Sequence, residues 1–240
     1  MQFGVDFVLK RMLATESFQT LVAAIWVWAK KTVAQWGEDR AALTAKREDL
    51  VALEREVITD RTTTNDAVES LHQDTSQALH MMRGFYRDNP VILSQLESLS
   101  ASAENTTPLL KEALALQSQW ELLPEADTNR VCLFTLAAFT AKRLATVATA
   151  EAFTGLLTRE RQCRTEFNGM IGHAWQDCVA WYETALAVFP EETPEGVNLR
   201  ATIPTELPEA AASGGSGGTT TVPPIPGDDA PSGGTGTPTG

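Results

Sequence analysis

The chain has 240 residues and a formal net charge of −12. A negative charge repels phosphate backbones and anionic lipid surfaces, which argues against general nucleic-acid binding and against electrostatic attachment to a membrane. Good helix formers such as Ala, Leu, Glu, Gln and Arg dominate, which favours an all-α fold. Residues from about Ala211 onward are almost entirely Gly, Ser, Thr, Pro and Asp, so roughly 200 residues remain to build a core.

The N-terminal part predicts two helices. Met1–Ala14 is a short amphipathic segment, and Thr15 or Ser17 is a suitable cap for a second helix that reaches Trp36. The apolar run in this second helix is too short for a membrane span. We expect a buried bundle helix, with membrane insertion of residues 1–36 as the alternative. The stripe expected to be buried comprises Phe18, Leu21, Val22, Ile25, Ala29, Val33 and Trp36.

Gly37 is expected to break the chain, and the central element then runs from Glu38 to Arg83. This stretch contains no proline, and its apolar residues recur at helical spacing. Leu43, Leu50, Leu53 and Val57 keep the spacing of a coiled coil, whereas Lys46 and Asp60 interrupt it, so we expect a multi-helix bundle. The weak helix formers of residues 62–65 leave two alternatives open, a turn that makes a hairpin or one continuous long helix.

Asn89-Pro90 predicts the end of this element, and two shorter helices follow, over 91–99 and 107–123. In the second half, Ala138, Ala141, Ala145 and Ala148 predict a small-residue face for close helix packing. Gly155, Gly169 and Gly172 are possible joints. The last helix is predicted to carry one apolar stripe, Trp175, Cys178, Val179, Tyr182, Ala185, Leu186 and Phe189, followed by a short return before Pro204.

Two similarities within the chain suggest an internal repeat. Residues 41–47 match 137–143 at six of seven positions, and the segment 85–90 resembles 189–194. Duplication of one helical unit explains both, and chance in an alanine-rich chain is the alternative. We therefore predict a bundle of long antiparallel amphipathic helices, with a first unit at 1–123, a second unit at 124–204 and a flexible tail at 205–240.

Candidate chemistry is sparse. Glu69 and His72 have the Glu-x-x-His spacing of di-iron bundles, but the second half has no counterpart, and His72 falls on the flank of its helix. Cys163, His173 and Cys178 match no usual zinc spacing, and Cys178 falls in the apolar stripe. His173 has Asp177 four residues later as a predicted surface partner. We therefore expect no catalytic, metal or cofactor site.

Six tryptophans are many for a helical protein, and exposure of Trp28 or Trp181 would mark a partner surface. The sequence favours a non-catalytic structural or scaffolding protein that forms homo-oligomers or packs helix faces against a protein partner. Membrane association through residues 1–36, or an enzyme with an unrecognised site, are the alternatives. Three cysteines, Cys132 included, are a poor disulfide framework, which favours a reducing compartment such as the cytoplasm.

Overall fold

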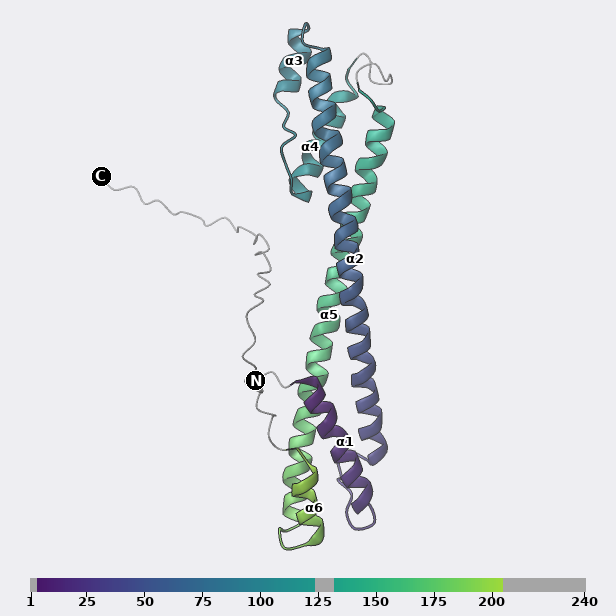
Figure 1. Cartoon of the computed structure of the whole chain (residues 1–240), viewed down its shortest axis with the longest axis vertical. Helices are drawn as coiled ribbons and strands as arrows, with labels where there is room; N and C mark the ends of the chain where they lie inside the picture. Colours follow the sequence, from purple (N-terminus) through teal and green to yellow (C-terminus); the bar gives the residue numbers. More distant parts are fainter. Residues whose placement is uncertain (1–3, 124–131, 205–240) are drawn as a thin grey trace, which may run out of the picture. The chain divides into compact units, whose positions relative to one another are not determined.

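The structure, a computed structural model, describes residues 4–123 and 132–204. These residues are helical with no strand, which confirms the predicted all-α class (Figure 1). Residues 1–204 form one compact unit, and the predicted tail at 205–240 lies outside the described residues. The helices are α1 (Val5–Val22), α2 (Val33–Phe85), α3 (Pro90–Glu97), α4 (Thr106–Trp120), α5 (Leu136–Val188) and α6 (Pro194–Thr202).

The two long helices, α2 and α5, pack against each other along their length (Figure 1). Each has 53 residues, or about 80 Å at 1.5 Å per residue. Threonine starts both: Thr32 forms a capping box with Gln35, and the Thr135 hydroxyl accepts from the Ala138 amide. The core side of α2 is buried at every seventh residue without interruption: Trp36, Leu43, Leu50, Val57, Thr64, Leu71 and Ala78.

Charged residues along the pair explain the interruptions in the sequence pattern. Lys46 lies three residues after a buried heptad position and donates to Glu166 of α5 at 2.5 Å. Asp74 has the same heptad position further along α2 and accepts from Lys142 at 2.5 Å. Lys46 and Asp60, which interrupt the apolar pattern, therefore share one heptad position at the edge of the contact between α2 and α5. Ion pairs between the antiparallel helices are tolerated there because water reaches them.

Two hydrophobic clusters lie toward opposite ends of the long helices. The first cluster joins α1 and α6 to the start of α2 and the end of α5. The second cluster joins α3 and α4 to the end of α2 and the start of α5. Between the clusters α2 and α5 run as a two-helix stretch (Figure 1).

The order of short helix, long helix and short helix occurs twice. Many residues 103 positions apart in the two copies are buried alike, beginning with Trp36 and Phe139 and ending with Leu96 and Leu199. Leu50 and Val57 differ, since their counterparts Phe153 and Glu160 are only partly buried. The short first helices correspond at a spacing of 101, as Val8 does to Leu109. Further buried pairs at the spacing of 103 are Leu43 and Thr146, Leu71 and Ala174, Thr75 and Cys178, and Ala78 and Trp181. Further buried pairs at the spacing of 101 are Met12 and Ala113, Gln19 and Trp120, and Val22 and Leu123.

This correspondence agrees with one of the two predicted repeat similarities. Pro90 and Pro194, 104 positions apart, each begin a short third helix. The matching segments 41–47 and 137–143 are 96 positions apart, seven fewer than the structural spacing. That pairing was wrong by one heptad, or about two helical turns, because a heptad pattern resembles itself after such a shift.

The N-terminal helices were predicted with the wrong breaks. Residues 5–22 form one helix, with no break at Thr15 or Ser17. The chain leaves helical structure over residues 23–32, in the run expected to be helical, and α2 passes through Gly37. Phe18, Val22 and Trp36 are buried as expected, whereas Leu21 and Ile25 are 64% and 69% exposed.

The long helices contain none of the predicted joints. Residues 62–65 continue α2, and Thr62 and Thr63 direct their hydroxyls to carbonyls one turn back, which rules out the hairpin. Gly155, Gly169 and Gly172 likewise lie inside α5. The small-residue face of Ala138, Ala141, Ala145 and Ala148 is exposed rather than packed. The predicted boundary between the first and second units, after residue 123, borders segment 124–131, which the structure does not describe. This boundary therefore stays a prediction.

Candidate functional site

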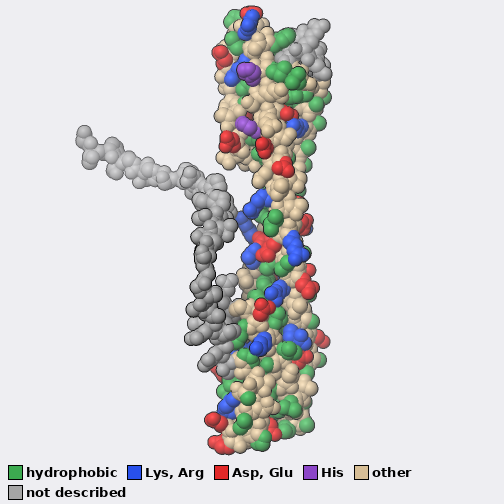
Figure 2. Space-filling view, in the orientation of Figure 1, with side chains coloured by type: hydrophobic (Ala, Val, Ile, Leu, Met, Phe, Trp, Pro, Cys, Tyr) green, Lys and Arg blue, Asp and Glu red, His purple; other side chains and the backbone are tan. Residues whose placement is uncertain are grey.

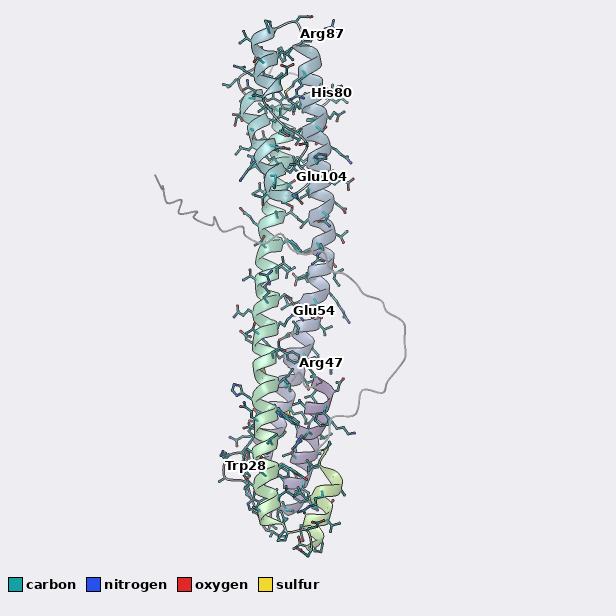
Figure 3. All side chains as sticks on the ribbon, turned by 90° about the vertical axis from the view of Figure 1, so that its left-hand side faces the viewer. Trp28, Arg47, Glu54, His80, Arg87 and Glu104 are labelled. Carbon is teal, nitrogen blue, oxygen red and sulfur yellow. The ribbon has the colours of Figure 1, made fainter. Side chains whose placement is uncertain are left out.

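A polar pocket lies between α2 and the segment that leads into α4. It has a volume of about 490 Å³ and is open to solvent. His72 brings an imidazole whose Nδ1 is buried without a hydrogen-bond partner among the described residues. Figure 3 labels Glu104, the acidic residue that sequence reasoning missed because it comes from a distant segment. The lining residues are Asn65, Val68, Glu69, His72, Glu104, Asn105 and Thr106.

This pocket brings two acidic side chains and one histidine together from two segments. Glu69 accepts a hydrogen bond from Gln73 at 3.4 Å. Within residues 4–123 and 132–204 no cluster of three or more His, Cys, Asp or Glu side chains could hold a metal ion. The arrangement offers carboxylate, imidazole, amide and hydroxyl groups for hydrogen bonding.

His173 lines a separate pocket of about 160 Å³ between α2 and α5, beside the first cluster. Its predicted partner Asp177 instead accepts from Lys31, which also pairs with Asp39 at 2.7 Å. Burial acts to lower the pKa of Lys31, but its hydrogen bonds to Asp177 and Asp39 outweigh this effect and the pKa is raised. Lys31 also lies 4.5 Å from the ring centre of Trp36, so it ties the 23–32 connection to both long helices.

The three cysteines are free and buried, so none is presented as a nucleophile. Burial raises the pKa of Cys178 to about 11, although nearby Arg11 acts in the opposite direction. Burial alone raises the pKa of Cys132 to about 11. The neutral thiol therefore dominates at physiological pH, and Cys178 is the small core residue that its sequence position predicts.

Trp28 and Trp181 lie in the first cluster rather than on a surface, so their predicted exposure is wrong. Trp28 is 5% exposed and stacks on Trp36 with ring centres 5.9 Å apart. Trp181 is fully buried, and its Nε1–H donates to Gln19 Oε1 at 2.6 Å. Neither indole forms the partner surface expected from the sequence.

Sequence reasoning also missed a buried cation. Arg11 is 3% exposed, and its guanidinium lies 4.6 Å from the ring centre of Trp175 and 5.4 Å from that of Tyr182. Its Nη1 donates to the Pro204 carbonyl at 3.0 Å. Desolvation lowers the pKa of this arginine. Arg11 thus fastens α1 to α5 and to the chain just after α6, a structural role with no sequence signature.

Exposed apolar residues repeat between the two halves. Leu21 and Leu122, at the spacing of the short helices, are 64% and 76% exposed. Phe85 and Val188, the last residues of the two long helices, are 49% and 40% exposed. We call Leu21 with Val188, and Leu122 with Phe85, the two end surfaces.

Each end surface belongs to one cluster. Phe18 packs against Phe189 with ring centres 5.8 Å apart, which brings the neighbours of Leu21 and Val188 together. Leu123 and Tyr86, the neighbours of Leu122 and Phe85, both belong to the second cluster. Two ends of equivalent construction therefore present apolar side chains to solvent.

In the part of the chain that the structure describes, no helix is long and apolar enough to cross a membrane. The alternative, insertion of residues 1–36 into a membrane, would require α1 to leave the first cluster, where Val8, Met12 and Phe18 are buried. No protein-family model, curated protein or solved structure gives a significant match to this chain.

Proposed function

We propose that this chain is a non-catalytic structural protein that self-associates through its two end surfaces. The observation that carries the proposal is the repetition of exposed apolar residues at Leu21 and Leu122, and at Phe85 and Val188. A second copy that covered these side chains would gain about 25 cal/mol for each Å² of apolar area removed from water.

The rest of the body supports a mechanical role. A series of cross-helix ion pairs fixes the antiparallel register of α2 and α5: Lys46 with Glu166, Glu54 with Arg164, and Asp74 with Lys142. Figure 2 shows acidic and basic side chains along the middle of the long helices on the face it displays. Such pairs give specificity of alignment more than stability.

Light scattering tests the proposal on the full chain. The wild type is expected to exceed the monomer mass of 26.0 kDa and to grow with concentration. The double variant Leu21→Glu/Leu122→Glu is expected to shift to the monomer, because it places a charge in both end surfaces. Leu144→Glu is the matched control, since Leu144 is 53% exposed on α5 and its counterpart in α2 is the small residue Ala41.

A wild-type mass of 26.0 kDa at all concentrations would refute self-association. Vesicle co-sedimentation with neutral lipids separates the membrane alternative, because Leu21, Ile25 and Val27 are exposed near the end of α1. Binding that is lost in an Ile25→Glu variant, together with a monomeric protein in solution, would favour that alternative.

A further inference from the structure

The short helices α1 and α4 follow the same stripe of α2. Arg40 and Arg47, each four residues after a buried heptad residue, pair with Glu16 at 3.1 Å and with Asp6 at 2.7 Å. Gly37, one residue after Trp36, also lies against Glu16 of α1. The pocket at the start of α4 involves Asn65, Val68 and His72, which have the same heptad positions. The N-terminal ends of α1 and α4 therefore face each other along one side of the helix pair.

Between these two ends, none of the described helices other than α2 and α5 lies on the stripe. From Arg47 to Asn65 is 18 residues along α2, or about 27 Å. Figure 3 labels Arg47 where α1 begins, Glu54 where only α2 and α5 run, and Glu104 near the start of α4. We call this the waist face: Val51, Glu54, Ile58 and Arg61 of α2 with their counterparts Thr154, Leu157, Arg161 and Arg164 of α5.

The waist face combines apolar side chains with unpaired positive charge. Val51 and Ile58, seven residues apart, are 38% and 67% exposed. Glu54 pairs with Arg164 at 2.9 Å. Among the described residues, Arg61 and Arg161 form no ion pair, so the face has two unmatched positive charges in a chain whose net charge is −12. This local charge differs in sign from the rest of the protein.

In the described part of the chain, the adjoining helix starts lack capping side chains, with Asp6 in the first turn of α1 and Glu104 just before the cap of α4. The N-caps Gly4 of α1 and Asn105 of α4 make no side-chain cap hydrogen bond within the described residues. The other helices have capping side chains at Thr32, Asn89, Thr135 and Thr193. First-turn amides without such caps attract carboxylates.

We propose that the waist face binds an amphipathic helix of a partner protein, with an apolar stripe flanked by Asp and Glu. A helix of about 16 residues fits the length between α1 and α4 and continues their line along α2 and α5. Its apolar stripe covers Val51, Ile58 and Leu157, and its carboxylates meet Arg61 and Arg161. A second copy of this chain is not the occupant, because two waist faces would bring like charges together.

Fluorescence anisotropy with a labelled 16-residue helical peptide tests this inference. The probe has leucine at i, i+3, i+4 and i+7 spacing with glutamate on both flanks, and a second peptide has lysine in place of every glutamate. The glutamate peptide is expected to bind at low salt and to weaken at least tenfold in Arg61→Glu/Arg161→Glu. Arg55→Glu/Arg87→Glu makes the same charge change at two exposed arginines outside the waist face and is expected to bind within twofold of wild type.

Ile58→Ser is expected to weaken binding while it keeps the charge, and circular dichroism checks that every variant retains its helicity. No binding of the glutamate peptide would overturn the inference. Equal binding of the lysine peptide, or equal loss in the Arg55→Glu/Arg87→Glu control, would overturn it as well. These outcomes are independent of self-association, since peptide binding is measured whether the protein is monomeric or not.

Discussion

Glu56 of α2 and Arg159 of α5 form an ion pair with Oε1 and Nη2 3.7 Å apart, and they are also counterparts in the two halves, 103 positions apart. Equivalent residues of two copies can meet only where the copies exchange places about a local two-fold axis. The pair therefore marks the centre of the duplicated arrangement. Both side chains are half-exposed, so the contact adds little to stability.

Gly196 has no room for a side chain. A Cβ at this position would lie 1.9 Å from the Pro190 carbonyl oxygen and 2.9 Å from that of Phe189. Gly196→Ala is expected to lower the free energy of unfolding by about 2 kcal/mol or more, because backbone atoms must move. Gly169→Ala, in α5 with nothing within 4 Å of the added Cβ, is expected to raise it by about 1 kcal/mol. Urea titration measures both, and equal effects would contradict the packing described for α6.

Thr64 is the polar member of the buried heptad series of α2. It is 5% exposed, and its Oγ1 has no hydrogen-bond partner among the described residues. Thr64→Val is expected to stabilise the protein by about 1 kcal/mol, because it removes a buried hydroxyl without changing the shape.

The matched control is Thr75→Val. Thr75 is fully buried, but its hydroxyl donates to the Leu71 carbonyl at 2.7 Å, so valine loses a hydrogen bond. We expect no gain, or a loss of up to about 1 kcal/mol. Thermal unfolding measures the change in stability of both variants. A loss of stability in Thr64→Val would contradict the unsatisfied hydroxyl of Thr64.

Gln19 connects the Trp181 indole to the main chain of Trp26 beside the first cluster. Its Oε1 accepts from Trp181 Nε1 at 2.6 Å, and its Nε2 donates to the Trp26 carbonyl at 3.4 Å. Gln19→Leu is expected to cost about 1–3 kcal/mol, because it leaves a buried indole N–H unpaired. Gln73→Leu, at an exposed glutamine with one weak contact, is expected to change stability by less than about 0.5 kcal/mol. Tryptophan fluorescence during denaturation reports both, and equal stabilities would show that the bond to Trp181 is unimportant.

The two perturbed thiols give a predicted pH dependence. Burial raises the pKa of Cys132 and Cys178 from 9.0 to about 11 in the folded protein. Between these values the unfolded chain binds fewer protons than the folded chain, so stability is expected to fall as pH rises from about 9 to about 11. Urea titrations of wild type and Cys132→Ala/Cys178→Ala across this range measure the effect. An unchanged slope in the double variant would contradict it.

The elements predicted well are those in which local sequence and burial agree. The spine from Glu38 to Arg83 lies inside α2, and the stripe of the last helix lies against the first cluster. Asn89-Pro90 follows the end of α2, as predicted, and it also begins α3 as cap and first-turn proline, because these residue types satisfy helix ends by themselves. Such features need no knowledge of distant contacts.

The misjudged elements depend on tertiary contacts. Gly37 stays helical because the first cluster and the capping box at Thr32 place the helix start earlier. Trp181 is buried by partners far away in the chain, and Trp28 stacks on Trp36 across the non-helical connection, so helical spacing alone does not reveal which apolar residues are covered. The alanine face of α5 remained exposed because α4 packs on another side, where Arg143 bonds Gln117 at 2.7 Å.

Each half of this chain has a 53-residue helix that finds its long partner only in the other half. A fragment with α1, α2 and α3 alone would leave the apolar side of α2 in water, and the nearest substitute for the missing half would be another molecule of the same fragment. The intact chain is thus arranged like a symmetric dimer whose two subunits are joined in one polypeptide. Joining them sets their ratio at one to one and makes their pairing independent of protein concentration.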